Sequence, residues 1–158
     1  MIVPIIMGSK EDMEFSKRIG EELGRLGIKY EYRIASAHKA TEYVLQMVGE
    51  YDAENDKTVY ITVAGRSNAL SAVIDANTAN PVIACPPYSD KFAGLDVLSS
   101  LRMPSGVCPA VVLEPKNAAL LAAKMLGLAD GAIKQKISGV KKELTDSIKE
   151  ADSTLRKQ

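Results

Sequence analysis

Short apolar runs alternate along most of the chain with segments in which apolar residues recur every three or four positions. The runs predict five buried strands, at Ile2–Met7, Lys29–Ala35, Thr58–Ala64, Pro81–Cys85 and Ala110–Leu113. The periodic segments predict helices at Glu11–Leu26, Thr41–Asp52, Leu70–Ala79, Gly94–Leu101 and Asn117–Leu126. Strands that alternate with helices form a parallel sheet covered on both faces, so we expect an α/β fold.

The C-terminal segment has a different pattern. Its apolar residues form a single stripe on a helix that is otherwise rich in Lys, Glu and Asp: Ile133, Ile137, Val140, Leu144, Ile148, Ala151 and Leu155. We therefore divide the chain into an α/β domain over 1–128 and a C-terminal helix over 129–158. The helix could fold back on its own domain. A helix added after a complete α/β unit more often needs a neighbour's surface, so we expect it to pack on a neighbouring subunit of a homo-oligomer.

Polar residues gather in three loops, each of which directly follows one of the first three predicted strands: Gly8–Asp12, Ser36–Lys39 and Ala64–Asn68. In parallel sheets ligands bind beyond the carboxyl ends of the strands, so these loops predict one shared site. The second loop holds His38, the only histidine among the 158 residues. An imidazole exchanges protons near neutrality, which makes His38 the candidate general acid or base. The alternative is a surface or capping histidine.

The other loop residues suit a phosphorylated small molecule. Ser9 and the start of the following helix can bind a phosphate, while Asp12 can accept hydrogen bonds from ligand hydroxyls; helix capping is the alternative for both. Lys39 and Arg66 supply cations, and the forked guanidinium of Arg66 matches phosphate oxygens. For Lys39 the alternative is an ordinary solvated lysine. Gly8 allows a close approach of the backbone to a ligand.

Composition excludes several other classes of function. Lys+Arg and Asp+Glu balance at 20 each, so no basic excess points to a nucleic-acid partner. No segment has the pattern of a signal peptide or a bilayer-spanning helix, and Cys85 and Cys108 are expected to be free thiols in a reducing cytoplasm. One histidine and two distant cysteines give no zinc-ligand spacing, and dinucleotide and P-loop motifs are absent. We therefore expect a cytoplasmic protein with no membrane partner, metal or cofactor.

The motifs taken together resemble one family. They are Met-Gly-Ser-x-x-Asp at Met7–Asp12, Ser-Ala-His-Lys at Ser36–Lys39, Ala-Gly-Arg-Ser-Asn at Ala64–Asn68, Asn77–Ala79, Pro81–Ile83, Cys85–Pro87 and Ser99–Gly106. In this order, from Ile2 to about Leu128, they are similar to the phosphoribosylaminoimidazole (AIR) carboxylase family, also called the PurE family. Any one of these motifs alone is a weak signal, whereas their combination is specific.

Within that family the chain is similar to class II. Class I members, the carboxyaminoimidazole-ribonucleotide mutases, carry Ser-Ala-His-Arg and a glycine-rich third loop with a second histidine. This chain has Lys39 and Arg66-Ser67-Asn68 at those places, and it has no second histidine. Class II, the form in vertebrate bifunctional purine enzymes, takes carbon dioxide directly without ATP, biotin or metal. The synthetase domain of those enzymes is absent from this sequence, so we expect a stand-alone carboxylase.

The resemblance implies a flavodoxin-like three-layer α/β/α sandwich, assembled into a homo-octamer with sites between subunits. It implies reversible carboxylation of AIR to carboxyaminoimidazole ribonucleotide (CAIR) with carbon dioxide, in de novo purine biosynthesis toward IMP. His38 is then the catalytic residue. The residues that carry over as substrate-binding are Gly8, Ser9, Asp12, Ser36, Ala37, His38, Lys39, Gly65, Arg66 and Ser67. The amides of Ser67, Asn68 and Ala69 are expected to hold carbon dioxide and the developing carboxylate.

Two other functions stay open on the sequence alone. One is the class I mutase reaction, which uses the carbamate isomer of CAIR instead of free carbon dioxide. The other is a module that binds phosphoribosyl ligands without turnover, in which nothing would depend on His38.

Overall fold

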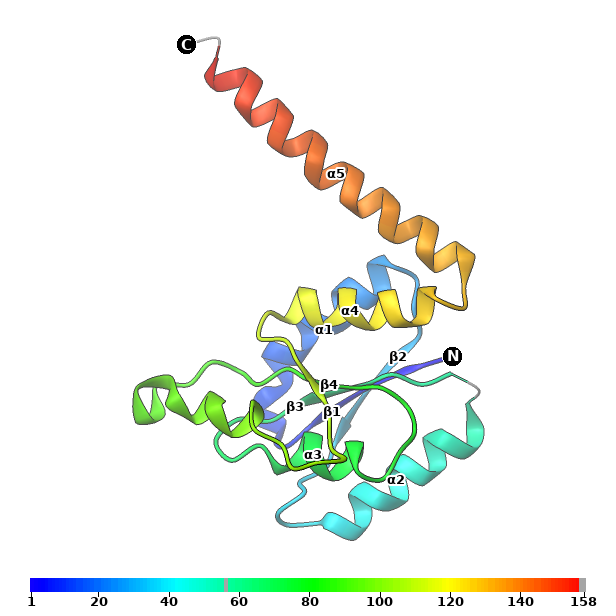
Figure 1. Ribbon diagram of the computed structural model, residues 1–158, viewed down its shortest axis with the longest axis vertical. Coiled ribbons are helices and arrows are strands. Elements are labelled where there is room, and N and C mark those ends of the chain that lie inside the picture. The colour runs from blue at the N-terminus through cyan, green and yellow to red at the C-terminus, as the bar shows by residue number, and fades with distance from the viewer. Residues whose placement is uncertain (56, 157–158) are drawn as a thin grey trace.

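The computed structural model of the protein describes residues 1–55 and 57–156 and is shown in Figure 1. Within these residues the strands are β1 (Val3–Met7), β2 (Tyr30–Ile34), β3 (Tyr60–Val63), β4 (Val82–Ala84) and β5 (Ala110–Val111). The helices are α1 (Met13–Arg25), α2 (Thr41–Glu54), α3 (Ala69–Asp75), α4 (Pro115–Gly127) and α5 (Gly131–Leu155). Two 3₁₀ segments, η1 (Lys10–Asp12) and η2 (Lys91–Ser100), complete the elements. Residues 157–158 of the predicted C-terminal segment lie outside the described part.

The strands form one parallel sheet in the order β2-β1-β3-β4-β5. Figure 1 shows α1 and α4 on one face of this sheet and α2 and α3 on the other. This arrangement is a flavodoxin-like three-layer sandwich, and it confirms the predicted α/β fold. The order places β1 between β2 and β3, so the loops that follow these three strands leave the sheet side by side.

The continuous apolar runs are explained by burial on both faces of the sheet. In β1, the side chains of Val3, Ile5 and Met7 belong to the apolar cluster that includes Ile19 and Leu23 of α1. Ile6 faces the opposite side, in the cluster formed with α2 and α3. A strand with helices on both sides has no solvent-facing positions, which is why its sequence does not alternate between apolar and polar residues.

All five predicted helices differ from the observed ones in at least one bound; α2 ends two residues later and α4 begins two residues earlier than predicted. Helix α1 begins at Met13, because the hydroxyl of Ser9 accepts the N–H of Glu11 and winds Lys10–Asp12 into a 3₁₀ turn. Helix α3 ends at Asp75, four residues before the predicted end. The predicted helix at Gly94–Leu101 is instead the 3₁₀ segment η2. Its residues Phe92, Ala93 and Gly94 have positive φ angles, which no regular right-handed helix contains.

The long C-terminal helix α5 leaves the domain that it starts on (Figure 1). Asp130 caps its first turn, Ile133 is buried, and Ile137 and Val140 pack against the core. Beyond that point the predicted stripe is exposed: the relative accessibility is 55% for Leu144, 70% for Ile148 and 69% for Leu155. The near half of α5 therefore packs on the α/β domain of the same chain, whereas the apolar positions of the far half stay uncovered.

None of the helices formed by residues 1–55 and 57–156 combines the length and apolar character that crossing a bilayer requires.

Candidate active site

The three predicted loops meet at the carboxyl edge of the sheet. The backbone N–H of Gly8 donates to the carbonyl oxygen of Val63 over 2.9 Å, which ties the end of β1 to the end of β3. On the other side the N–H of Ala35 donates to the carbonyl oxygen of Met7, also over 2.9 Å. The ends of β2, β1 and β3 are therefore locked together, and the first polar residues after them face the same space.

Gly8 is not required by the packing of the protein itself. A Cβ added at this position would lie 3.5 Å from the Cβ of Ala64, which is an ordinary van der Waals contact. Its φ angle is not among the positive ones. The absence of a side chain at Gly8 thus leaves open space at the carboxyl edge, as a ligand that approaches the backbone would need.

Ser9 and Asp12 differ in how far helix capping explains them. The hydroxyl oxygen of Ser9 accepts the N–H of Glu11 over 3.0 Å, so Ser9 is a cap whose hydroxyl proton can still be donated to a ligand. Asp12 stands at the N-cap position of α1, but its side chain makes no capping hydrogen bond. Its carboxylate is half-buried instead, at the side where Arg66 lies.

Burial raises the pKa of the Asp12 carboxyl above its ordinary value of 3.8, and the nearby charge of Glu11 acts in the same direction. The backbone amide of Ser9 and the positive charge of Arg66 lower this pKa, without cancelling the effect of burial. The first and third loops thus come close enough for Arg66 to act on Asp12 electrostatically. A half-buried carboxylate whose burial is only partly compensated by these groups is suited to accept hydrogen bonds from ligand hydroxyls.

The second loop is a tight turn that presents two of the predicted site residues to solvent. The N–H groups of Lys39 and Ala40 both donate to the carbonyl oxygen of Ser36, over 3.2 and 2.8 Å. Ala37 is buried and anchors the turn, Ser36 is half-buried, and His38 and Lys39 are exposed. The imidazole and the ammonium group are therefore free of the core and available to a ligand.

The third loop is shaped by residues far away in the sequence. Arg66 has a φ angle of 59°, and its N–H donates to the carboxylate of Asp96 over 3.2 Å. Asn68 is buried, its side-chain oxygen accepts the N–H of Ser71, and its side-chain amide donates to the hydroxyl of Ser100. Asn68 thus caps α3 and joins the loop to η2, which is a structural role that the sequence alone does not reveal.

Two of the three predicted carboxylate-binding amides already donate within the protein. The N–H of Asn68 donates to the hydroxyl of Ser99 over 3.1 Å, and the N–H of Ala69 donates to the carbonyl oxygen of Ser67 over 2.9 Å. Among these three amides, that of Ser67 is the candidate that stays open to a ligand in the described part of the chain.

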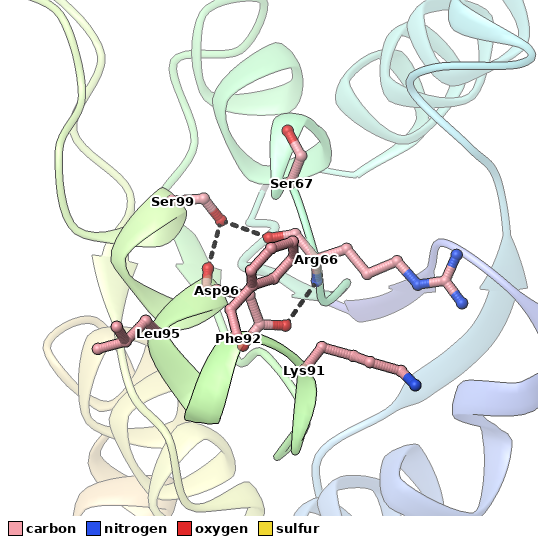
Figure 2. Close-up of a pocket in the computed structure, with 7 residues that line it drawn as sticks. All are labelled: Arg66, Ser67, Lys91, Phe92, Leu95, Asp96 and Ser99. Carbon is pink, nitrogen blue, oxygen red and sulfur yellow. Dashed lines mark hydrogen bonds between the residues drawn. The ribbon is translucent and has the colours of Figure 1, made fainter.

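A cavity of about 690 Å³ adjoins the third loop. Two of its lining residues, Arg66 and Ser67, belong to the predicted site, and the other five come from η2: Lys91, Phe92, Leu95, Asp96 and Ser99. Figure 2 shows the side chains of Arg66 and Lys91 extending to the same side of the cavity. Of the five η2 residues, only Ser99 lies in a motif noted from the sequence. Nothing in the local pattern of 91–96 marks a site.

The remaining reactive groups do not add to this site. Burial raises the pKa of the Cys85 thiol to about 12, so at neutral pH the sulfur stays protonated and is a poor nucleophile. Cys108 is exposed, and its N–H donates to the carboxylate of Asp75. Within the described residues, no three His, Cys, Asp or Glu side chains gather closely enough to hold a metal ion.

Several known proteins are similar in sequence to this chain over almost its whole length. A family model described as AIR carboxylase matches residues 2–147. A phosphoribosylaminoimidazole carboxylase from Archaeoglobus fulgidus is 53% identical over 96% of this chain and 83% of that protein. One from Treponema denticola is 50% identical over 99% of this chain and 98% of that protein. A human bifunctional phosphoribosylaminoimidazole carboxylase/succinocarboxamide synthetase is 39% identical over 98% of this chain but only 36% of its own length.

The fold comparison agrees with these sequence matches. The crystal structure of Treponema denticola PurE superposes with a TM-score of 0.95 and 51% sequence identity, covering 98% of each chain.

Proposed function

This chain belongs to the AIR carboxylase family, and from that premise we propose that it is a class II member, which adds carbon dioxide itself to AIR without ATP or biotin. It is a carboxy-lyase that acts on AIR in purine biosynthesis. Two features support the assignment to class II. Lys39 and Arg66-Ser67-Asn68 stand where class I carries arginine and a glycine-rich loop with a second histidine. The chain is also 39% identical to the human bifunctional enzyme.

One observation carries the mechanism: the loops of the site converge on one edge of the sheet, and the only imidazole of the chain stands there. The aminoimidazole ring of AIR is an enamine, so a ring carbon can attack carbon dioxide and form the new carbon–carbon bond. That carbon then bears both a proton and a carboxylate. His38 removes the proton, whose bonding electrons restore the aromatic ring. Return of the proton by His38 starts the reverse reaction, which releases carbon dioxide.

The other loop residues bind and orient the substrate. Ser9, Ser36, Lys39 and Arg66 bind the phosphate, and Asp12 accepts hydrogen bonds from the ribose hydroxyls. The open amide of Ser67 stabilises the new carboxylate, a task that is typically worth about 3 kcal/mol per donor in such sites. Because the phosphate is remote from the reacting carbon, its binding energy serves to position the ring and thereby supports turnover as well as affinity.

The site is completed by other subunits of a homo-octamer. His38, Lys39, Arg66 and Ser67 are exposed in the single chain, whereas chemistry on carbon dioxide needs a site from which water is excluded. Large apolar side chains are also exposed on two elements, η2 with Phe92 and Leu95 and the far half of α5 with Ile148. Exposed apolar surface of this kind is typical of protein–protein interfaces. The enzyme works in the cytoplasm, where Cys85 and Cys108 stay reduced.

The carbon source tests this proposal. Purified protein is given AIR and bicarbonate without ATP, with and without carbonic anhydrase, and the formation of CAIR is followed. Carboxylation should start faster with carbonic anhydrase, because that enzyme supplies carbon dioxide when it is limiting.

Each other outcome points to a different alternative. Turnover of the carbamate isomer alone would assign the chain to class I and would show that Lys39 and Arg66 do not distinguish the classes. Binding of AIR without turnover from either carbon source would favour the non-catalytic module.

A further inference from the structure

Arg66 holds an unusual backbone conformation for its residue type. Its φ angle of 59° lies in the left-handed region, which residues other than glycine and asparagine rarely adopt. Such a conformation persists only where the surrounding structure enforces it, and it is found most often at functional sites. The chain therefore needs contacts that hold Arg66 in place.

Two side chains of η2 supply those contacts (Figure 2). The carboxylate of Asp96 accepts the backbone N–H of Arg66 over 3.2 Å. The hydroxyl of Ser99 lies 2.9 Å from the backbone carbonyl oxygen of Arg66 and 2.8 Å from that of Asp96, so its one proton is shared between these two acceptors. Ser99 also accepts the N–H of Asn68 over 3.1 Å. The peptide groups on both sides of the Cα of Arg66 thus contact η2, through residues 30 and 33 positions later in the chain.

These contacts involve only the backbone of Arg66, and within residues 1–55 and 57–156 its guanidinium makes no hydrogen bond or salt bridge. Figure 2 shows the Arg66 side chain extending away from Asp96 and Ser99, on the side of the cavity where Lys91 also extends. The carboxylate of Asp96 would repel a phosphate or a carboxylate, since their charges have the same sign. The hydrogen bond that this carboxylate accepts from the backbone N–H of Arg66 explains its place in the cavity better than a contact with the ligand does.

We propose that Asp96 and Ser99 are positioning residues, which hold the left-handed backbone of Arg66 and thereby aim its guanidinium at the phosphate of the substrate. This inference rests on the proposed function, in which Arg66 binds that phosphate. If the backbone of Arg66 relaxed to a negative φ, the direction of its Cα–Cβ bond would turn relative to β3, and the guanidinium would leave the phosphate position.

Single substitutions test whether activity depends on the carboxylate of Asp96 and the hydroxyl of Ser99. Asp96→Ala and Ser99→Ala should each lower kcat/KM for AIR roughly fivefold to tenfold, as expected when hydrogen bonds that orient a charged group are lost. Asp96→Ala removes the bond to the N–H of Arg66, and Ser99→Ala removes those to the carbonyl oxygen of Arg66 and the N–H of Asn68. Asp96→Asn should largely restore activity, because its amide oxygen still accepts the N–H of Arg66. Asp90→Ala is the matched control: Asp90 lies at the start of the same segment, is exposed and makes no capping hydrogen bond, so kcat/KM should stay unchanged.

A double-mutant cycle with Arg66→Ala separates positioning from a general structural effect. If Asp96 acts through Arg66, then Asp96→Ala should change kcat/KM less than about twofold when Arg66 is already alanine, because coupled residues are not additive. Equal losses in the two backgrounds would overturn the inference and leave the proposed function intact. If Arg66→Ala alone leaves kcat/KM unchanged, both the phosphate role of Arg66 and this inference fail. If the Asp96→Ala protein does not fold, the same cycle is measured with Ser99→Ala in its place.

Discussion

Asp12 is half-buried at the start of α1, yet its carboxylate makes no capping hydrogen bond. Because burial raises its pKa in the folded state above 3.8, the folded protein binds more protons than the unfolded chain in the pH range just above that value. Stability therefore falls as the pH rises through this range, and at neutral pH the ionised Asp12 lowers the free energy of unfolding. A residue that costs stability at working pH is expected to serve the ligand.

Replacing this carboxylate should separate stability from activity. We expect Asp12→Asn to raise the melting temperature at pH 7, and we expect the gain to disappear below about pH 3.8, where the aspartate is protonated in both states. The affinity for AIR should fall about tenfold or more, as is typical for hydrogen bonds to a charged acceptor. Thermal unfolding at several pH values and KM for AIR measure the two effects. A variant that is less stable at pH 7 would contradict this account.

His38 is the residue on which the chemistry depends. We expect His38→Asn to lower kcat by about 10²–10⁴-fold, which is the usual contribution of general acid–base catalysis, while KM for AIR changes little. The side chain is exposed, so the substitution should leave the fold and the oligomer mass as they are. Steady-state kinetics on protein of confirmed mass checks this, and activity within about tenfold of the unchanged enzyme would exclude the assigned role.

At the scale of single elements, η2 and α5 have features that are unfavourable in an isolated chain. Segment η2 leaves Phe92 and Leu95 exposed and contains three residues with positive φ. Helix α5 continues well past its last core contacts. Phe92 and Leu95 of η2 and the apolar side chains in the far half of α5 thus stay uncovered in the single chain. In the proposed homo-oligomer they would be the surfaces that meet other subunits.

The far half of α5 offers a direct test of assembly. We expect the double variant Leu144→Asp, Ile148→Asp to lower the mass in solution from that of the proposed octamer to smaller species, since each buried apolar side chain contributes about 1.5–3 kcal/mol. Carboxylase activity should fall with the mass, because in the proposed assembly neighbouring subunits complete the site. Light scattering after size exclusion measures the mass. Lys142→Asp, on the opposite side of the same helix, is the control, and an unchanged octamer in the double variant would contradict the assigned role of α5.

At the scale of the whole molecule, the order of the strands creates the site. Because β1 lies between β2 and β3, three loops separated by more than twenty residues in the sequence come together at one edge. The sheet is rigid there, since backbone hydrogen bonds of 2.9 Å join Gly8 to Val63 and Ala35 to Met7. A rigid edge with exposed polar loops is well suited to hold a substrate in one orientation. In the proposed octamer, neighbouring subunits would exclude water from it.

Sequence by itself determined the architecture and the edge of the sheet at which the candidate site lies. Hydrophobic periodicity reports burial on each side of an element, so the strands of the sheet and the helices α1, α2 and α4 are predicted within a few residues. The parallel α/β pattern in turn requires that loops such as Ser36–Lys39 lie at the carboxyl edge. The shared motifs then identified the family, which the sequence and structure comparisons confirm.

Only the tertiary structure decided how the third loop is held and which surfaces stay open. The left-handed backbone of Arg66 leaves no trace in composition, and its contacts with Asp96 and Ser99 join residues 30 and 33 positions apart. The same holds for Asn68, whose capping of α3 and contact with Ser100 depend on where η2 lies. Periodicity records which side of an element is apolar but not what covers it. For this reason the stripe on α5 was visible in the sequence, whereas the point at which that stripe leaves its own domain was not.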